Sequence, residues 1–197
     1  MSNQASRSVP LSPEVIVDAA LRVIEREGFD RLTMRAVAAE LGVTPMAIYY
    51  HVPDKDALVE LVLEAVHVGP PLELGEEGWE EVLRRHLLTQ WEQLARYPGV
   101  GAHLLEQPLL GATPDSIRAG VAFFEAAGFP PRTARLAWSF AMTYLHGRLS
   151  VDARWHGKAP AGARVAGIRS RDYVAFGVDA VVAGLRAMLR DATAAEG

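Results

Sequence analysis

Residues 44–55 bring together side chains that could recognise another molecule from one helical surface. Ile48 takes the apolar position of a short helix there, and the residues around it are left mostly outside. These outer residues are Thr44, Pro45, Met46, Ala47, Tyr49 and Tyr50. A short helix with small and aromatic groups on its outer face suits insertion into the major groove of DNA. The stretch therefore predicts recognition of a nucleic acid.

A preceding helix and a tight turn must position this short helix. Thr33 is a good N-cap, because its hydroxyl can accept a hydrogen bond from a free amide of the first turn. An apolar stripe follows at Val37, Ala38 and Leu41. Gly42 can take the left-handed conformation that ends a helix, and Thr44 is expected to cap the next one. The pattern is typical of two helices joined by a turn.

A further helix before this pair completes a small three-helix unit. Ser12 is expected to cap it, Pro13 to occupy its first position and Gly28 to end it. Its buried face is predicted at Ile16, Ala19, Ala20, Val23 and Ile24, with Phe29 plugging the core. Asp54 should cap a fourth helix, whose apolar stripe must meet the next part of the chain.

Three features of this region occur in one register. They are Thr33 with Arg35, Leu-Gly-Val at 41–43, and Ile-Tyr-Tyr-His-Val-Pro-Asp-Lys-Asp-Ala-Leu at 48–58. Together they resemble the signature of the tetracycline-repressor (TetR) family of bacterial regulators. The resemblance covers the first third of the chain. The later helices resemble tetracycline-repressor-like C-terminal domains in number and layout only.

The resemblance implies DNA-binding roles for the matching residues. Arg35 would reach a base or a phosphate, and Tyr49 and Lys55 would hold phosphates. The residues expected near base edges are Thr44, Pro45, Met46, Ala47 and Tyr50, and Thr33 and His51 complete the expected contact set. Pro45, Met46 and Ala47 stand where the family often has more polar residues, so they favour apolar contact.

The charge of the chain bears on how it could bind DNA. The net charge is −4, but residues 31–55 hold three basic groups and two acids, a net of +1. A protein that bound DNA through phosphates alone would be more basic. Specific binding by a dimer, which doubles the basic contacts, fits this charge better than indiscriminate binding.

The rest of the chain predicts a second, all-helical domain. Helices are expected at 79–96, 102–106, 115–127, 131–155 and 172–189, with loops at 108–111 and 156–170. The Gly and Pro residues at 69–71 and the glycines at 75 and 78 mark the boundary. We therefore expect an all-α protein with a DNA-binding domain and connecting helix at 12–67. A domain for ligand binding and dimerisation is expected at 78–190.

Two helices of this second domain could line a ligand pocket. The candidate residues are His86, Gln90, Trp91, Trp138, Met142, Tyr144 and His146, an apolar wall with a few polar groups. An ordinary core is the alternative, and the sequence leaves both open. The helices 131–155 and 172–189 carry more apolar surface than one chain can cover. Gly177, Ala180 and Gly184 would permit close approach, so a homodimer through these helices is expected.

Other kinds of chemistry find little support. The chain has no cysteine, and no nucleophile elbow or Gly-rich phosphate loop is present. His67, His86, His103 and His146 do not pair at a ligand spacing, so neither a metal nor another cofactor is expected. The first ten residues do not form a signal peptide, and no apolar run reaches the length of a membrane helix. We expect a soluble, cytoplasmic protein.

These observations favour a DNA-binding transcription regulator over an enzyme. The expected partners are double-stranded operator DNA and a largely apolar small-molecule inducer that releases a repressor from its operator. The alternative is a helical small-molecule-binding protein or enzyme in which residues 12–55 serve only for packing.

Overall fold

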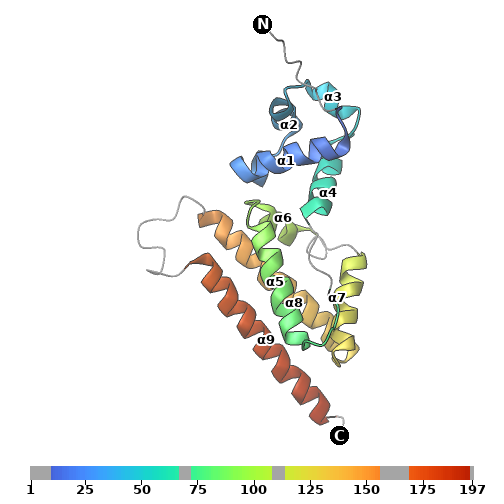
Figure 1. The fold of residues 1–197 in the computed structure, drawn as a ribbon, viewed down its shortest axis with the longest axis vertical. Helices are drawn as coiled ribbons and strands as arrows, with labels where there is room; N and C mark the ends of the chain where they lie inside the picture. The colour runs from blue at the N-terminus through green and yellow to red at the C-terminus, as the bar shows by residue number, and fades with distance from the viewer. Residues whose placement is uncertain (1–9, 67–71, 108–113, 156–168, 196–197) are drawn as a thin grey trace. The chain divides into compact units, whose positions relative to one another are not determined.

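The computed structural model describes residues 10–66, 72–107, 114–155 and 169–195 of the chain (Figure 1). The chain divides into two compact units, Met1–Val66 and His67–Gly197. All regular structure in the described residues is helical, so the all-α prediction is confirmed. Among these helices, none combines the length and apolarity that crossing a membrane requires. The residues at 69–71, which were predicted to mark the boundary, lie outside the described residues.

The first unit contains a three-helix arrangement followed by a fourth helix. Its elements are α1 (Pro13–Glu27), a 3-10 turn at Phe29–Arg31, α2 (Met34–Leu41), α3 (Pro45–Tyr49) and α4 (Lys55–Val66). Helix α1 packs on α2 and α4, and α2 packs on α3. The five predicted core residues of α1 are fully buried and Phe29 is nearly so, as the helical spacing predicted.

Local capping fixes where most of these helices begin and end. The Ser12 hydroxyl accepts a hydrogen bond from the Val15 amide at 3.4 Å, and the Thr33 hydroxyl accepts one from the Ala36 amide at 3.0 Å. Asp54 Oδ1 accepts from the Ala57 amide at 2.8 Å. Gly42 adopts a left-handed conformation with φ 67°, which only glycine takes without steric cost. These four predictions are confirmed.

The predicted side-chain cap of α3 is wrong. Thr44 occupies the N-cap position, but its hydroxyl makes no capping hydrogen bond. The Ala47 amide instead donates to the Thr44 carbonyl oxygen at 3.0 Å, because the helix opens on a tight i to i+3 turn. The prediction fails because it treated a five-residue helix like a longer one.

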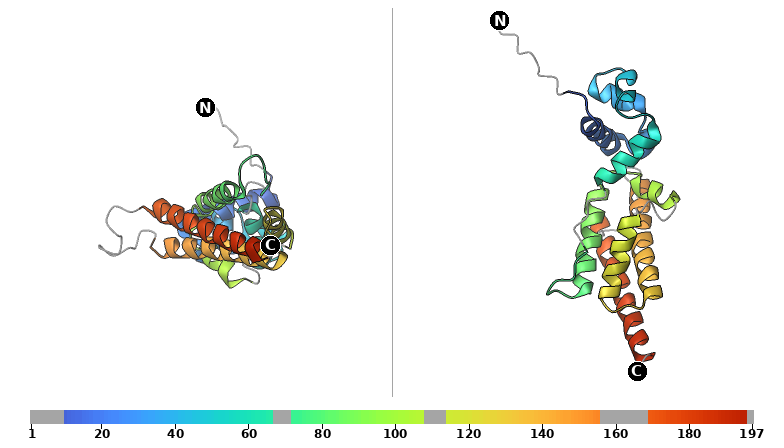
Figure 2. Two further views of the ribbon diagram at one scale, coloured as in Figure 1. Left: turned by 90° about the horizontal axis from the view of Figure 1, so that it is seen from below. Right: turned by 90° about the vertical axis from the view of Figure 1, so that its right-hand side faces the viewer.

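The second unit is a bundle of five helices in its described residues. They are α5 (Trp79–Leu94), α6 (Val100–Glu106), α7 (Pro114–Ala126), α8 (Pro131–Trp155) and α9 (Ser170–Ala195). Helix α8 contacts the other four, and α5 also contacts α9. Figure 2 shows α5, α7, α8 and α9 running side by side along the bundle. At one end, the rings of Trp79, Phe124 and Phe129 pack edge to face.

Helix boundaries differ from the predicted ones mainly in α9. It begins at Ser170 and reaches Ala195, whereas 172–189 was expected. The Asp172 carboxylate accepts the Arg169 amide at 3.0 Å and so extends the start. No glycine or proline interrupts residues 190–195, so nothing local ends the helix earlier. The expected loop at 108–111 and most of that at 156–170 lie outside the described residues.

Candidate nucleic-acid interface and buried polar core

The outer surface of α3 is exposed, as its spacing predicted. Ile48 is fully buried, whereas Met46 is 65% exposed, Tyr49 46% and Tyr50 83%. Thr44 and Pro45 are exposed too, and Ala47 is half-buried. We call the side chains of Thr44, Pro45, Met46, Tyr49 and Tyr50 the α3 face. This surface contains three large apolar or aromatic groups that no described residue of the unit covers.

The α3 face is held in place by buried residues on both sides of it. Before α3, the amides of Gly42 and Val43 donate to the carbonyl oxygens of Ala39 and Ala38 and close the end of α2. After α3, the Val52 amide donates to the Ile48 carbonyl oxygen at 2.9 Å, and the Val52 side chain is fully buried. The helix is therefore anchored through Ile48 and Val52, and its outer side chains are free to contact a ligand.

Ion pairs separate the basic side chains of this unit into two groups. Arg22 and Arg26 of α1 both bind the Glu40 carboxylate of α2, at 2.8 Å and 2.9 Å. Hydrogen bonds from these two guanidinium groups hold the pKa of Glu40 below its usual value. Arg35 and Lys55 are exposed and form no ion pair with any described residue. Their charges remain available to an anion, although the unit as a whole is acidic.

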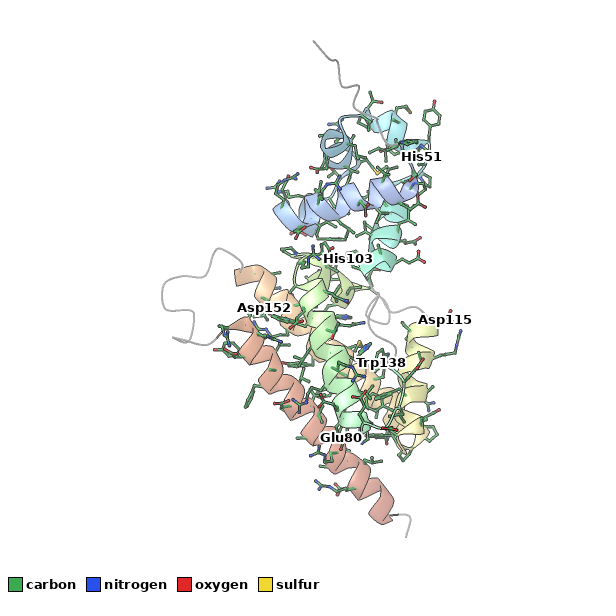
Figure 3. The ribbon with its side chains drawn as sticks, in the orientation of Figure 1. His51, Glu80, His103, Asp115, Trp138 and Asp152 are labelled. Carbon is green, nitrogen blue, oxygen red and sulfur yellow. The ribbon has the colours of Figure 1, made fainter. Side chains whose placement is uncertain are left out.

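The remaining predicted DNA contacts are exposed residues of the same unit. The Thr33 hydroxyl accepts the capping bond of α2 and keeps its own hydrogen to donate. His51 is exposed at the end of α3, where Figure 3 labels it. The structure thus places all ten predicted residues between the start of α2 and the start of α4. Sequence reasoning missed Glu40, which forms ion pairs with both Arg22 and Arg26 of α1.

Five of the seven predicted ligand residues are buried on α5 and α8, and two of them, His86 and Trp138, contact each other across these helices. His86 and Gln90 lie one turn apart on α5, and Trp138, Met142 and His146 lie at the same spacing on α8. The rings of His86 and Trp138 are 6.1 Å apart, and Figure 3 shows Trp138 between α5 and α7. Gln90 Oε1 is buried without a hydrogen-bond partner among the described residues, which is costly unless something donates to it.

The other two predicted ligand residues make hydrogen bonds between helices. The Tyr144 hydroxyl donates to the carbonyl oxygens of Tyr173 and Val174 on α9, at 3.4 Å and 3.2 Å. Burial raises the pKa of this hydroxyl, so it remains a donor at neutral pH. Trp91 is half-buried, and its Nε1 donates to Asp152 Oδ2 of α8 at 3.2 Å. These two side chains hold the bundle together.

Asp152 is the polar residue of the bundle that sequence reasoning missed. Its carboxylate accepts from Trp91 of α5 and pairs with Arg148 one turn earlier on α8. The Arg148 guanidinium also lies over the Tyr173 ring of α9, 5.6 Å from its centre. The i, i+4 spacing of Arg148 and Asp152 was the available signal. In the described part of the chain, no group of three or more His, Asp or Glu side chains could hold a metal ion.

Comparison with known proteins addresses the first unit most directly. Residues 16–62 match the family model described as bacterial regulatory proteins, tetR family. An HTH-type transcriptional regulator of Saccharopolyspora erythraea is 30% identical over 168 residues, which are 82% of this chain and 70% of the relative. Tetracycline repressor protein class D of Escherichia coli is 35% identical over 102 residues, which are 50% of this chain but 47% of that protein.

A solved structure extends the similarity to the second unit. ActR of Streptomyces coelicolor, crystallised in complex with actinorhodin, superposes with a TM-score of 0.72 and 20% sequence identity. The match covers 91% of this chain and 97% of that one, and it shows that the two proteins share a fold. The α3 face is exposed, the family model matches the first unit, and one relative is 30% identical over most of the chain. The chain therefore belongs to the tetR family of bacterial regulatory proteins, which are DNA-binding transcriptional regulators.

Proposed function

We propose that this protein is a homodimeric repressor that leaves its operator when a small, largely apolar molecule binds the second unit. The observation that carries the DNA-binding part is the α3 face together with the cations Arg35 and Lys55, which form no ion pair with described residues. The relatives are transcriptional regulators, so the protein is proposed to act by binding and not by catalysis. It would act in the cytoplasm, where bacterial operator DNA lies.

The proposed DNA contacts fall into two classes. Tyr49 and Lys55 would bind phosphates, with Thr33 and His51 assisting from the ends of α2 and α3, and Arg35 would bind a base or a phosphate. Thr44, Pro45, Met46, Ala47 and Tyr50 would face base edges in the major groove. Phosphate contacts would position the protein, and contacts to base edges would provide specificity.

Homodimer formation is supported by exposed apolar residues on each of the last two helices. On α8 it includes Leu136, Phe140 and Val151, which are 57%, 57% and 42% exposed, and on α9 it includes Phe176 and Met188, at 76% and 57%. The three residues of α8 recur at the spacing of one helix face, whereas Phe176 and Met188, twelve residues apart, lie about 120° from each other around α9. Two-fold symmetry would bring these residues of two chains together as a four-helix bundle.

Two glycines on α8 and α9 support the same arrangement. Gly147 and Gly184 lie within helices, where glycine destabilises by about 1 kcal/mol relative to alanine. A Cβ atom at either position would meet nothing within 4 Å in this chain, so packing inside the chain does not require them. Close approach of a second chain would require them.

The proposed inducer site is the buried polar core between α5 and α8. An apolar molecule with a hydrogen-bond donor would satisfy Gln90 Oε1 and pack against Trp138 and Met142. One relative is named a tetracycline repressor, and ActR was crystallised in complex with actinorhodin. The inducer must bind more tightly to the conformation that releases DNA, because equal affinity for both conformations shifts neither.

Selection of bound sites from random duplex DNA tests the proposed function. We expect a palindromic consensus whose affinity falls steeply as salt is raised, since each phosphate contact releases counterions. A scrambled duplex of equal length and composition serves as the control. Equal affinity for both duplexes would favour a helical binding protein or enzyme that does not read DNA. Compounds that release the selected duplex then identify the inducer.

A further inference from the structure

The α3 face lacks the side chains that usually read bases by paired hydrogen bonds. Residues 43–50 contain no Arg, Lys, Asn, Gln, Asp or Glu. Guanine is commonly read by Arg or Lys, adenine by Asn or Gln, and cytosine by Asp or Glu. The hydroxyls of Thr44, Tyr49 and Tyr50 are the polar groups that the exposed surface of this segment offers instead. A different feature of the bases must therefore carry much of the specificity.

Met46 is a large, exposed aliphatic side chain of this surface. It is 65% exposed, with the ring of Pro45 before it and the half-buried Ala47 after it. Its thioether chain is flexible and polarisable, so it can fit closely against a flat apolar group. In the major groove, the C5-methyl group of thymine is the apolar feature that distinguishes one base from the others.

The charges around the α3 face are compatible with DNA as its partner. Arg35 on α2 and Lys55 at the start of α4 form no ion pair with described residues. Glu40, the acidic residue of α2, is neutralised by Arg22 and Arg26. An apolar centre flanked by available cations complements a groove whose floor carries methyl groups and whose edges carry phosphates.

We propose that Met46 is a specificity-determining residue that recognises the C5-methyl group of a thymine in each operator half-site. This inference rests on the proposed function, since it requires that the α3 face enters the major groove. Met46 would contribute by removing its own apolar surface and that of the methyl group from water. Pro45 would limit the space beside the methyl group, and the Thr44 hydroxyl would remain free to bond a neighbouring base.

Replacing thymine by uracil one position at a time in the selected operator tests this proposal. Uracil lacks only the C5-methyl group, so pairing and hydrogen-bonding groups are unchanged. We expect one position in each half-site at which the parent protein binds about fourfold more weakly. This is the effect of about 0.8 kcal/mol for one buried methylene-sized group, at about 1.4 kcal/mol per factor of ten. Replacing both symmetric thymines should weaken binding about 15-fold.

The Met46→Ala variant tests whether Met46 is the side chain that contacts the thymine methyl group. It should bind the thymine operator more weakly than the parent and should not distinguish thymine from uracil at the sensitive position. Met46 is exposed, so the variant should melt at the parent temperature. Met46→Gln, of similar length, should shift the selected base at that position from thymine to adenine, since glutamine pairs with adenine N6 and N7.

The possible outcomes separate this proposal from the proposed function. Absence of any selected operator would overturn both. A selected operator without a uracil-sensitive position would leave the repressor function intact and overturn methyl recognition. A uracil effect of equal size in the parent and in Met46→Ala would show that another side chain reads the methyl group, and would overturn the role of Met46.

Discussion

Single residues of the first unit divide into those that build α3 and those that it presents. Ile48 and Val52 are fully buried, whereas Tyr49 between them is 46% exposed. A change confined to the exposed end of Tyr49 should therefore alter binding without altering the fold. For a charged residue such as Glu40, the ion-pair partners in the structure likewise indicate what a substitution should change.

Tyr49→Phe removes only the hydroxyl proposed to donate to a phosphate. We expect operator affinity to fall by about 1.5 kcal/mol per subunit, the typical value for a hydrogen bond to a charged group. The melting temperature should be unchanged. Binding titrations at matched salt give the measurement, with Tyr97→Phe in the second unit as the control. Equal affinity of variant and parent would remove Tyr49 from the interface.

Glu40 predicts how the stability of the first unit depends on pH. Its pKa is held below the usual 4.5 by hydrogen bonds from Arg22 and then Arg26. A lowered pKa means that the contribution to stability is fully present above about pH 4.5 and is lost as the pH falls through the lowered value. The free energy of unfolding should therefore fall less steeply with acid in Glu40→Gln than in the parent.

Chemical denaturation between pH 6 and pH 3 measures this difference. Glu60→Gln is the matched control, because Glu60 is exposed on α4 and pairs with no described residue. Parallel stability profiles for Glu40→Gln and the parent would show that the two arginines contribute nothing to folding through this carboxylate.

At the scale of elements, the sequence predicted helices better than it predicted their contacts. Caps at Ser12, Thr33 and Asp54 and the turn at Gly42 depend on neighbouring residues, and the structure confirms them. Thr44 failed because the local turn used the backbone carbonyl. The exposure of the α3 face was predicted from helical periodicity, since Ile48 occupies the inward position of this short helix.

Contacts between helices were harder to predict because they depend on packing across distant parts of the chain. The hydrogen bonds of Tyr144 to α9 and of Trp91 to Asp152 were not predicted. Helical spacing identifies the face of a residue, but it does not identify which neighbouring helix lies against that face. His86 and Trp138 were placed correctly together because each lies at the centre of a buried stripe.

Gly120→Ala tests how closely α7 approaches α8. A Cβ atom at Gly120 would clash with the Trp138 indole, which is buried and has the His86 ring on another side. Alanine favours a helix, but overpacking should outweigh this and destabilise the protein by about 1–3 kcal/mol. Denaturant titration measures the loss, with Gly75→Ala as control, since nothing lies within 4 Å of a Cβ there. A stabilised variant would mean that α7 is free to move away.

At the scale of the molecule, the second unit should bring two reading surfaces together. The first unit alone has few available cations, so a single α3 face would bind DNA weakly. Two faces held one or more turns of DNA apart would bind a palindrome together. In the proposed dimer, the exposed apolar residues of α8 and α9 would therefore affect DNA affinity as well as assembly.

Gly184→Arg should separate the proposed dimer and abolish operator binding while the chain stays folded. Nothing in the chain obstructs a side chain at this exposed position, so the monomer can accommodate arginine. Analytical ultracentrifugation and binding titrations give the two measurements. Gly75→Arg adds the same charge away from these apolar residues and should remain dimeric. A dimeric Gly184→Arg protein, or full operator affinity from a monomer, would contradict the arrangement.

The contact between Tyr144 and Gly177 restricts the order in which this protein can change during evolution. The Tyr144 hydroxyl reaches the α9 backbone across Gly177, and a Cβ atom there would overlap the tyrosine ring. A lineage could not readily gain a side chain at 177 while 144 remains tyrosine. Loss of the ring first would remove that obstacle, but it would leave α8 and α9 without this contact until a replacement arose. Descendants that keep Tyr144 should therefore also keep Gly177.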